Sequence, residues 1–163
     1  MRALLPGELW HRRYRVLRSL GQGGAASAVL VHDLVRKRDV ALKILRAPDA
    51  RAAFLREFRL LAGLEHPRLA RVHDFGIELG VPFYTSDFVD GEPLEAWAAL
   101  RTERELAAAL VDALQALGFL HRARIRHGDF KSDNVLVDSC GRAVLIDLSC
   151  AREIGLPADA GTG

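Results

Sequence analysis

Three polar side chains in the second half of the chain could carry out phosphate chemistry. Asp129, Asn134 and Asp147 lie at short spacings within the stretch His127–Ser149, between two apolar segments typical of strands. A carboxylate can orient and deprotonate a hydroxyl acceptor, and a carboxamide and a second carboxylate are hard oxygen ligands for magnesium. These residue types therefore indicate phosphoryl transfer from ATP, with Mg²⁺ as the metal.

This stretch resembles the catalytic loop of protein kinases, H-R-D-L-x-x-x-N, which the magnesium motif D-F-G follows. Gly128 stands where that family has Arg, Phe130 stands where it has Leu, and the magnesium motif reads Asp147-Leu148-Ser149. The Arg of the family binds a phosphorylated residue of the activation segment. With Gly128 in its place, we do not expect activation by that route.

The resemblance implies a role for each polar residue of the loop. Asp129 is expected to act as the base, Lys131 to contact the transferred phosphate, and Asn134 and Asp147 to hold magnesium, which makes Asp129, Lys131 and Asn134 the catalytic residues. A lysine two residues after the base is typical of serine/threonine kinases, so the resemblance favours Ser or Thr as acceptor. His127 is expected to be a buried, hydrogen-bonded packing residue.

The first half of the chain carries further motifs of the same family in the expected order. The segment Leu20–Ala28 resembles the glycine loop G-x-G-x-x-G-x-V, although Ala26 replaces its third Gly and Ala28 its Val. Val40–Lys43 resembles V-A-I-K, in which the lysine pairs the α and β phosphates. Glu57 is expected to be the helix partner of that lysine.

Composition supports phosphate binding, because the chain has only three lysines, and two of them are Lys43 and Lys131. The compact ammonium group of lysine suits phosphate oxygens. The third, Lys37, reads as a solvated loop residue. The residues expected to bind the nucleotide are Leu20, Gly21, Gln22, Gly23, Gly24, Ala28, Ala41, Lys43, Glu57, Asp87, Val89 and Leu136. Among these, the backbone of Asp87 and Val89 would hold the adenine edge.

The hydrophobic pattern predicts an α+β fold like that of protein kinases. An N-terminal lobe, residues 1–90, is expected to hold a five-stranded antiparallel sheet. Its strands are predicted at Tyr14–Leu20, Ala28–Leu34, Val40–Leu45, Leu69–Ile77 and Pro82–Val89. The lobe also holds one helix, in which Phe54, Phe58 and Leu61 repeat at helical spacing and which Asp49 is expected to cap and Gly63 to end.

Residues 91–163 are expected to form the first part of a helical C-terminal lobe, with Asp90–Pro93 as the hinge. Thr102–Glu105 is a capping-box signal, and the apolar residues that follow predict one long helix. A short hairpin is predicted from Val135–Val137 and Val144–Ile146. Gly161–Gly163 resembles the start of G-T-x-x-Y-x-A-P-E, so we expect a chain truncated within the activation segment, or one that a protein partner completes or regulates.

Length and charge exclude several classes of protein. The chain of 163 residues has a net charge of +2, two cysteines and no apolar run near the roughly 20 residues that cross a bilayer. We therefore expect a cytoplasmic chain without a membrane segment and without a nucleic-acid partner. Arginine, leucine and alanine richness suggests a bacterial genome, so the resemblance is to bacterial, eukaryotic-like Ser/Thr protein kinases.

Two alternatives to an ATP-dependent Ser/Thr protein kinase remain open. The altered glycine loop and Ser149 favour a pseudokinase or truncated scaffold that binds nucleotide without turnover. Small-molecule kinases of the aminoglycoside or choline type also have a catalytic loop that reads H-G-D-x-x-x-x-N. Lys131 and the glycine loop favour the protein-kinase branch, and the expected partner is then a protein substrate with Ser or Thr hydroxyls.

Overall fold

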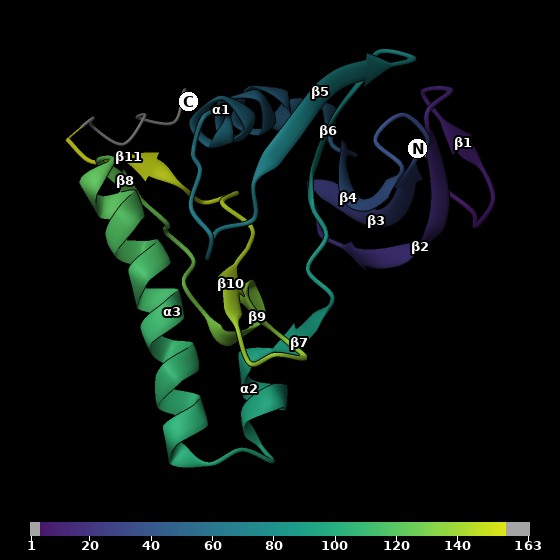
Figure 1. The fold of residues 1–163 in the computed structure, drawn as a ribbon. Helices are drawn as coiled ribbons and strands as arrows, with labels where there is room; N and C mark the ends of the chain where they lie inside the picture. Colours follow the sequence, from purple (N-terminus) through teal and green to yellow (C-terminus); the bar gives the residue numbers. More distant parts are fainter. Residues whose placement is uncertain (1–3, 156–163) are drawn as a thin grey trace. The chain divides into compact units, whose positions relative to one another are not determined.

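The computed structural model describes residues 4–155, which form two compact units (Figure 1). The first unit holds residues 4–64 and 70–88, and the second holds residues 65–69 and 89–155. The segment Gly161–Gly163, which resembles the start of an activation segment, lies outside the described residues.

The first unit is built on one antiparallel sheet with the strand order β1-β2-β3-β4-β6-β5. Five of its strands match the predicted ones within a few residues: β2 (Tyr14–Gln22), β3 (Ala26–Asp33), β4 (Arg38–Leu45), β5 (Val72–Glu78) and β6 (Val81–Asp87). The prediction of five strands was wrong by one, because β1 (Leu9–Trp10) pairs with the start of β2. A two-residue strand has no measurable periodicity, and the turn before β2 relies on positive φ angles at His11 and Arg12, which composition does not indicate.

Alternating burial gives this sheet its core. In β4, Val40, Leu42 and Ile44 are buried, as period-two patterning requires. Phe83 of β6 lies edge to face with Trp10, at 6.0 Å between ring centroids, and with Tyr14, at 5.9 Å. This hydrophobic cluster keeps the strands in register.

The helix α1 (Arg51–Leu61) lies beside β5 in Figure 1 and packs its aromatic face on the sheet. Phe54 and Phe58 contact Tyr84 of β6, with ring centroids 5.3 and 6.1 Å apart. The prediction that Asp49 caps this helix was wrong, because a 3₁₀ turn, Pro48–Ala50, leads directly into it and makes Ala50 the cap residue. Gly63, with φ of +99°, follows the end of the helix as predicted.

The second unit contains two helices and two small sheets. The helices are α2 (Leu94–Ala98) and α3 (Glu103–Arg122). One sheet has the order β10-β9-β7, from β10 (Ala143–Leu145), β9 (Val135–Asp138) and β7 (Gly91–Pro93), and the other pairs β11 (Arg152–Glu153) with β8 (Ile125–Arg126). The hairpin β9–β10 confirms the predicted one.

Most of the segment Asp90–Pro93, which is predicted to be the hinge, forms a short strand of the second unit. Gly91–Pro93 forms β7 and pairs with β9. A Cβ atom on Gly91 would lie 2.6 Å from the carbonyl oxygen of Val137, so only glycine allows this close approach. The sequence alone gives no sign of such a distant pairing.

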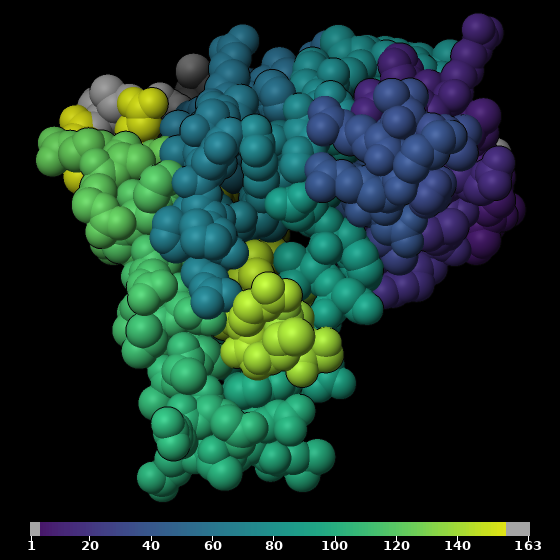
Figure 2. Space-filling view, viewed as in Figure 1, coloured from purple at the N-terminus to yellow at the C-terminus, as the bar shows by residue number. Residues whose placement is uncertain are grey.

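The capping box of α3 is confirmed, because the Thr102 hydroxyl accepts from the Glu105 backbone N–H and the Glu105 carboxylate accepts from that of Thr102. Small residues make up most of the fully buried face of α3. Leu110 and Leu114 are 38% and 56% exposed, whereas Ala109, Ala113, Ala116 and Leu120 are fully buried. The small alanines let α3 approach β10 closely, and part of the surface of α3 is visible in green in Figure 2.

Residues 65–69 belong to the second unit through specific contacts. The ring of His66 stacks on Phe119 with centroids 5.0 Å apart, and Arg68 Nε lies 3.0 Å from Asp112 Oδ1. None of the helices within residues 4–155 combines the length and the apolar character needed to cross a bilayer.

Candidate functional site

The glycine segment forms the turn between β2 and β3 in the first unit. The Gly23 N–H donates to the carbonyl oxygen of Ala26 at 2.9 Å, and Gly21 pairs with Ala28. Neither Gly21 nor Gly24 has a positive φ angle, and a Cβ atom on either would meet nothing within 4 Å. The packing and backbone of the chain therefore do not explain these glycines, and they leave room for a ligand to approach the backbone.

A buried ion pair lies in the same unit. Lys43 Nζ, from β4, is 2.7 Å from Glu57 Oε1, from α1, and the two side chains are 19% and 5% exposed. The Tyr84 hydroxyl donates to the same Glu57 oxygen at 2.7 Å. The carboxylate is thus held by two donors and in turn fixes the lysine ammonium group.

Tyr84 is a member of this cluster that the sequence reasoning missed. It lies opposite Lys43 in the β4–β6 register, and its ring centroid is 5.9 Å from Lys43 Nζ. A buried tyrosine usually needs a hydrogen-bond partner, and this is the only property of Tyr84 that could have indicated its role from the sequence.

The other residues expected to bind a nucleotide are divided between the two units. In the first unit, Ala28 of β3 lies opposite Lys43, and Ala41 of β4 lies opposite Ser86. Leu20 and Gln22 lie on β2, where Arg46 Nη1 donates to the Gln22 side chain at 2.9 Å. Val89 and Leu136 lie in the second unit.

The backbone N–H of Asp87, at the end of β6, is already hydrogen-bonded within the protein. Its N–H donates to the carbonyl oxygen of Arg71 at 2.9 Å, so that group serves the pairing with the neighbouring strand. Its carboxylate accepts from the Arg71 backbone N–H at 3.2 Å and lies 2.8 Å from His73 Nε2. A ligand would thus use other backbone atoms at this edge.

In the second unit, His127 fixes the loop that carries Asp129. Its side chain is buried; Asp129 N–H donates to Nδ1 at 3.3 Å, and Nε2 lies 3.3 Å from the carbonyl oxygen of Ile146. Nδ1 is therefore the acceptor and Nε2 carries the hydrogen. Burial lowers the pKa of His127, which keeps the ring neutral, and the packing role expected for it is confirmed.

Asp129 is surrounded by two donor side chains. Its Oδ2 lies 2.8 Å from Lys131 Nζ and accepts from Asn134 Nδ2 at 3.0 Å. The Lys131 hydrogen bond, with a smaller contribution from Asn134, lowers the pKa of Asp129, although Asp147 opposes the shift. Asp129 is therefore a carboxylate at neutral pH that is held in one orientation but remains 37% exposed.

Asn134 and Asp147 are brought together through the backbone. The Ile146 N–H donates to the Asn134 carbonyl oxygen at 2.8 Å, which places Asp147 next to Asn134. Asn134 Nδ2 is used by Asp129, so its side-chain oxygen is the atom suited to a cation. Asp147 has φ of +54°, and its Oδ1 accepts from the Ser149 N–H at 3.1 Å.

The oxygen atoms of Asn134 and Asp147 suit a magnesium ion that is also bound by phosphates and water. They are too few for a metal ion that is bound by protein side chains alone. Within residues 4–155 there is no group of three or more His, Cys, Asp or Glu side chains that could hold a metal ion. One carboxylate and one carboxamide oxygen match the way Mg²⁺ is bound together with phosphates and water.

Gly128 is required by the path of the chain. Its φ is +84°, and a Cβ atom would lie 2.2 Å from the carbonyl oxygen of Cys150. The backbone after Asp147 thus returns directly against the loop that carries Asp129. No side chain fits at this position without moving one of the two segments.

Comparison with known proteins identifies the family of this chain. The family model described as "Protein kinase domain" matches residues 14–161. A probable serine/threonine-protein kinase of Streptomyces coelicolor is 36% identical over 156 residues, which cover 88% of this chain and 23% of the relative. The serine/threonine-protein kinase PrkC of Bacillus subtilis is 30% identical over 159 residues, covering 93% of this chain and 24% of the relative.

A third relative, the DNA damage-responsive serine/threonine-protein kinase RqkA of Deinococcus radiodurans, is 38% identical over 154 residues, covering 88% of this chain and 23% of the relative. The chain spans about a quarter of the length of the curated relatives it matches. The family match covers nearly all of the chain. This chain therefore belongs to the protein kinase domain family.

Proposed function

We propose that this chain carries the ATP-binding and catalytic-loop elements of a serine/threonine protein kinase that transfers the γ-phosphate of ATP to protein hydroxyls. The observation that carries the proposal is the Asp129 carboxylate, held by Lys131 at 2.8 Å and by Asn134 at 3.0 Å. The names of the three relatives support the same class of reaction.

Asp129 acts on the acceptor hydroxyl. As a carboxylate it accepts a hydrogen bond from that hydroxyl and directs the oxygen at the γ-phosphorus. The new O–P bond forms as the bond from phosphorus to the β–γ bridging oxygen breaks, ADP leaves, and the hydroxyl proton passes to Asp129. Because its pKa is lowered, Asp129 is a weak base, and it takes the proton late, when the new bond has acidified the hydroxyl.

The cationic side chains neutralise phosphate charge. Lys131 sits beside Asp129 and is suited to the transferred phosphoryl group, whose oxygens gain charge during transfer. Lys43, fixed by Glu57 and Tyr84, is suited to the α and β phosphates. Magnesium, which Asn134 and Asp147 would hold, neutralises phosphate charge when bound.

The acceptor is proposed to be a serine or threonine of a protein substrate, since Lys131 occupies the position typical of Ser/Thr kinases. A further protein partner that completes or regulates the domain is also proposed. We place the domain in the cytoplasm because its cosubstrate, ATP, is made there. Cell fractionation with an antibody against residues 4–155 tests this location.

The first experiment is calorimetric titration of the purified chain with Mg-ATP. We expect micromolar binding, about 8 kcal/mol, because both phosphate-binding elements are formed. Lys43→Ala and Asp147→Asn should each weaken it at least tenfold. Lys37→Ala and Asp90→Asn make the same chemical changes at exposed positions and should leave the affinity unchanged.

Transfer of phosphate is measured next, with serine/threonine peptides and aminoglycosides as competing acceptors. Phosphorylated peptide supports the proposal. Binding without any transfer would assign the chain to nucleotide-binding scaffolds, and phosphorylated aminoglycoside would assign it to small-molecule kinases. A folded chain that does not bind Mg-ATP would refute the nucleotide role of Lys43 and Asp147.

A further inference from the structure

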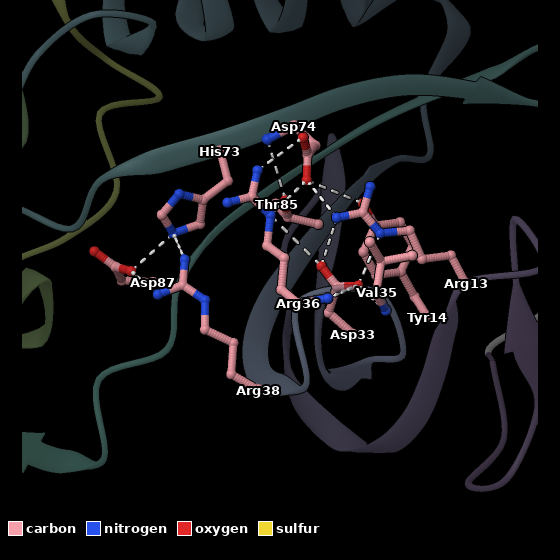
Figure 3. A network of polar contacts seen from close by, with 10 residues as sticks. All are labelled: Arg13, Tyr14, Asp33, Val35, Arg36, Arg38, His73, Asp74, Thr85 and Asp87. Carbon is pink, nitrogen blue, oxygen red and sulfur yellow. Dashed lines mark hydrogen bonds and ion pairs between the residues drawn. The ribbon is translucent and has the colours of Figure 1, made fainter.

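A polar pocket of about 350 Å³ lies within the first unit, apart from Lys43 and the glycine loop. Its lining comes from the turn before β4 and the start of that strand, from the start of the edge strand β5 with the residue before it, and from the end of β6. Figure 3 shows the side chains of Arg36, Arg38, His73 and Asp87. The residues are Arg36, Arg38, Arg71, Val72, His73 and Asp87. Three guanidinium groups thus line one cavity that contains a single carboxylate.

Carboxylates outside the cavity hold one of these arginines in place. Arg36 Nη2 lies 3.1 Å from Asp74 Oδ1, and Asp74 also accepts from Arg13 at 2.8 Å. Asp33, which is fully buried, binds Arg13 at 2.6 Å and lies 3.7 Å from Arg36. Arg38 Nη1 in turn lies 3.7 Å from Asp87 Oδ1, so two arginines of the pocket are held by carboxylates on neighbouring elements.

His73 has two neighbours that compete for one nitrogen atom. Its side chain is 7% exposed, and Nε2 lies 2.8 Å from Arg38 Nη2 and 2.8 Å from Asp87 Oδ1. A protonated Nε2 can donate to Asp87 but then faces an N–H of Arg38. An unprotonated Nε2 can accept from Arg38 but then faces a carboxylate oxygen, so either state leaves one of the two contacts unfavourable.

An oxyanion in the pocket would remove this conflict. It would accept the hydrogens of Arg38, so that His73 could donate to Asp87 alone. Arginine forks match phosphate oxygens in a bidentate manner. The volume of about 350 Å³, against roughly 30 Å³ for one water molecule, leaves room for a phosphate and the group that carries it.

We propose that the pocket formed by Arg36, Arg38, Arg71 and His73 is a second phosphate site, which binds a phosphate monoester through its guanidinium groups. The monoester belongs either to a phosphorylated side chain of a protein or to a free phosphorylated metabolite. This site does not depend on ATP binding or phosphotransfer.

The test is an NMR titration of the whole chain with ¹⁵N-labelled histidine, at pH 7.5 and constant ionic strength. Inorganic phosphate is the first probe, and the ring nitrogens of His73 are the readout. We expect a saturable shift with a millimolar dissociation constant, because Arg38 leaves Nε2 when phosphate binds. Arg38→Gln and Arg71→Gln should each weaken binding at least tenfold.

Two matched variants locate the effect. Arg15→Gln removes the same charge from an exposed position of β2 outside the pocket and should change the dissociation constant less than twofold. Lys43→Ala should leave phosphate binding intact even if it abolishes Mg-ATP binding. The proposal is overturned if Arg15→Gln weakens binding as much as Arg38→Gln does, if Lys43→Ala abolishes it, or if the His73 signals do not respond.

A phosphothreonine peptide and its unphosphorylated form distinguish the two sources. Binding of the phosphopeptide at least tenfold tighter than that of inorganic phosphate, with no binding of the unphosphorylated form, supports a protein ligand. Equal affinity for phosphopeptide and inorganic phosphate supports a small phosphorylated metabolite. Equal binding of the two peptides overturns a phosphate site.

Discussion

Gly128→Ala tests whether the chain returns against the catalytic loop as closely as the structure has it. The added Cβ would lie 2.2 Å from the carbonyl oxygen of Cys150 and 3.2 Å from its Cβ. A non-glycine residue in the left-handed region costs about 1–2 kcal/mol. Relieving the overlap by moving packed segments costs about 1–3 kcal/mol more, so we expect a loss of about 2–5 kcal/mol in the free energy of unfolding.

The assay is urea unfolding followed by circular dichroism, with Gly118→Ala as the control. Gly118 lies inside α3, and a Cβ there would meet only the end of the Arg122 side chain, at 3.6 Å. This control should stabilise the protein by up to about 1 kcal/mol, because alanine is the better helix former. Equal stability of Gly128→Ala and the wild type would refute the argument.

The close approach of Cys150 to Gly128 also explains why this chain has glycine where the family has arginine. An arginine at position 128 would place its Cβ in the same overlap, so restoring the family residue should destabilise the loop rather than restore a phosphate-binding arginine. The glycine and the returning segment at Cys150 therefore depend on each other.

Three other predictions concern single contacts. Burial raises the pKa of Asp33, but the Arg13 side chain and the backbone N–H groups of Val35 and Arg36 together outweigh it and lower the pKa from 3.8 to about 2. About 2 kcal/mol of stability should therefore be present above pH 4 and lost as pH falls to about 2; urea midpoints against pH measure this, and an unchanged loss in Asp33→Asn would contradict it. Tyr84→Phe removes the hydroxyl group that donates to Glu57. This charge-assisted hydrogen bond contributes about 1.5–3 kcal/mol, so the variant should have a lower free energy of unfolding and a lower affinity for Mg-ATP. If calorimetry finds the wild-type affinity, Tyr84 has no role in fixing Lys43. Thr102→Ala should cost about 0.5–2 kcal/mol through loss of the capping box, as measured by thermal unfolding, with Ser139→Ala in an exposed turn as a control for the loss of a hydroxyl group.

Sequence patterns predicted the local elements well because local physics determines them. Alternating burial gave five strands, and Thr102 with Glu105 gave the start of α3. The patterns failed where distant segments decide the outcome. Apart from Leu120, the fully buried residues of α3 are alanines, which let the helix approach β10 closely.

The candidate site shows the same division. Asp129, Lys131 and Asn134 lie within six residues, so their spacing in the sequence already indicated that they meet. The hydrogen bond from Tyr84 to Glu57 spans 27 residues, and the contact of Arg36 with Asp74 spans 38. No periodicity reports such pairs, and only the register of the sheet brings them together.

The network around His73 explains why ordinary-looking arginines are worth testing for a second function. Arg36 and Arg38 flank Lys37, which reads in the sequence as a solvated loop residue, and a surface ion pair contributes little to stability. The pocket does not optimise these pairs, since His73 Nε2 cannot satisfy Arg38 and Asp87 at once. If the network served stability alone, replacing either Arg38 or Asp87 would remove the unfavourable contact and stabilise the protein. If the network binds an anion, both residues have a role, because Arg38 binds the anion and Asp87 accepts from His73. The unfavourable contact therefore supports binding rather than stability as the role of this pocket.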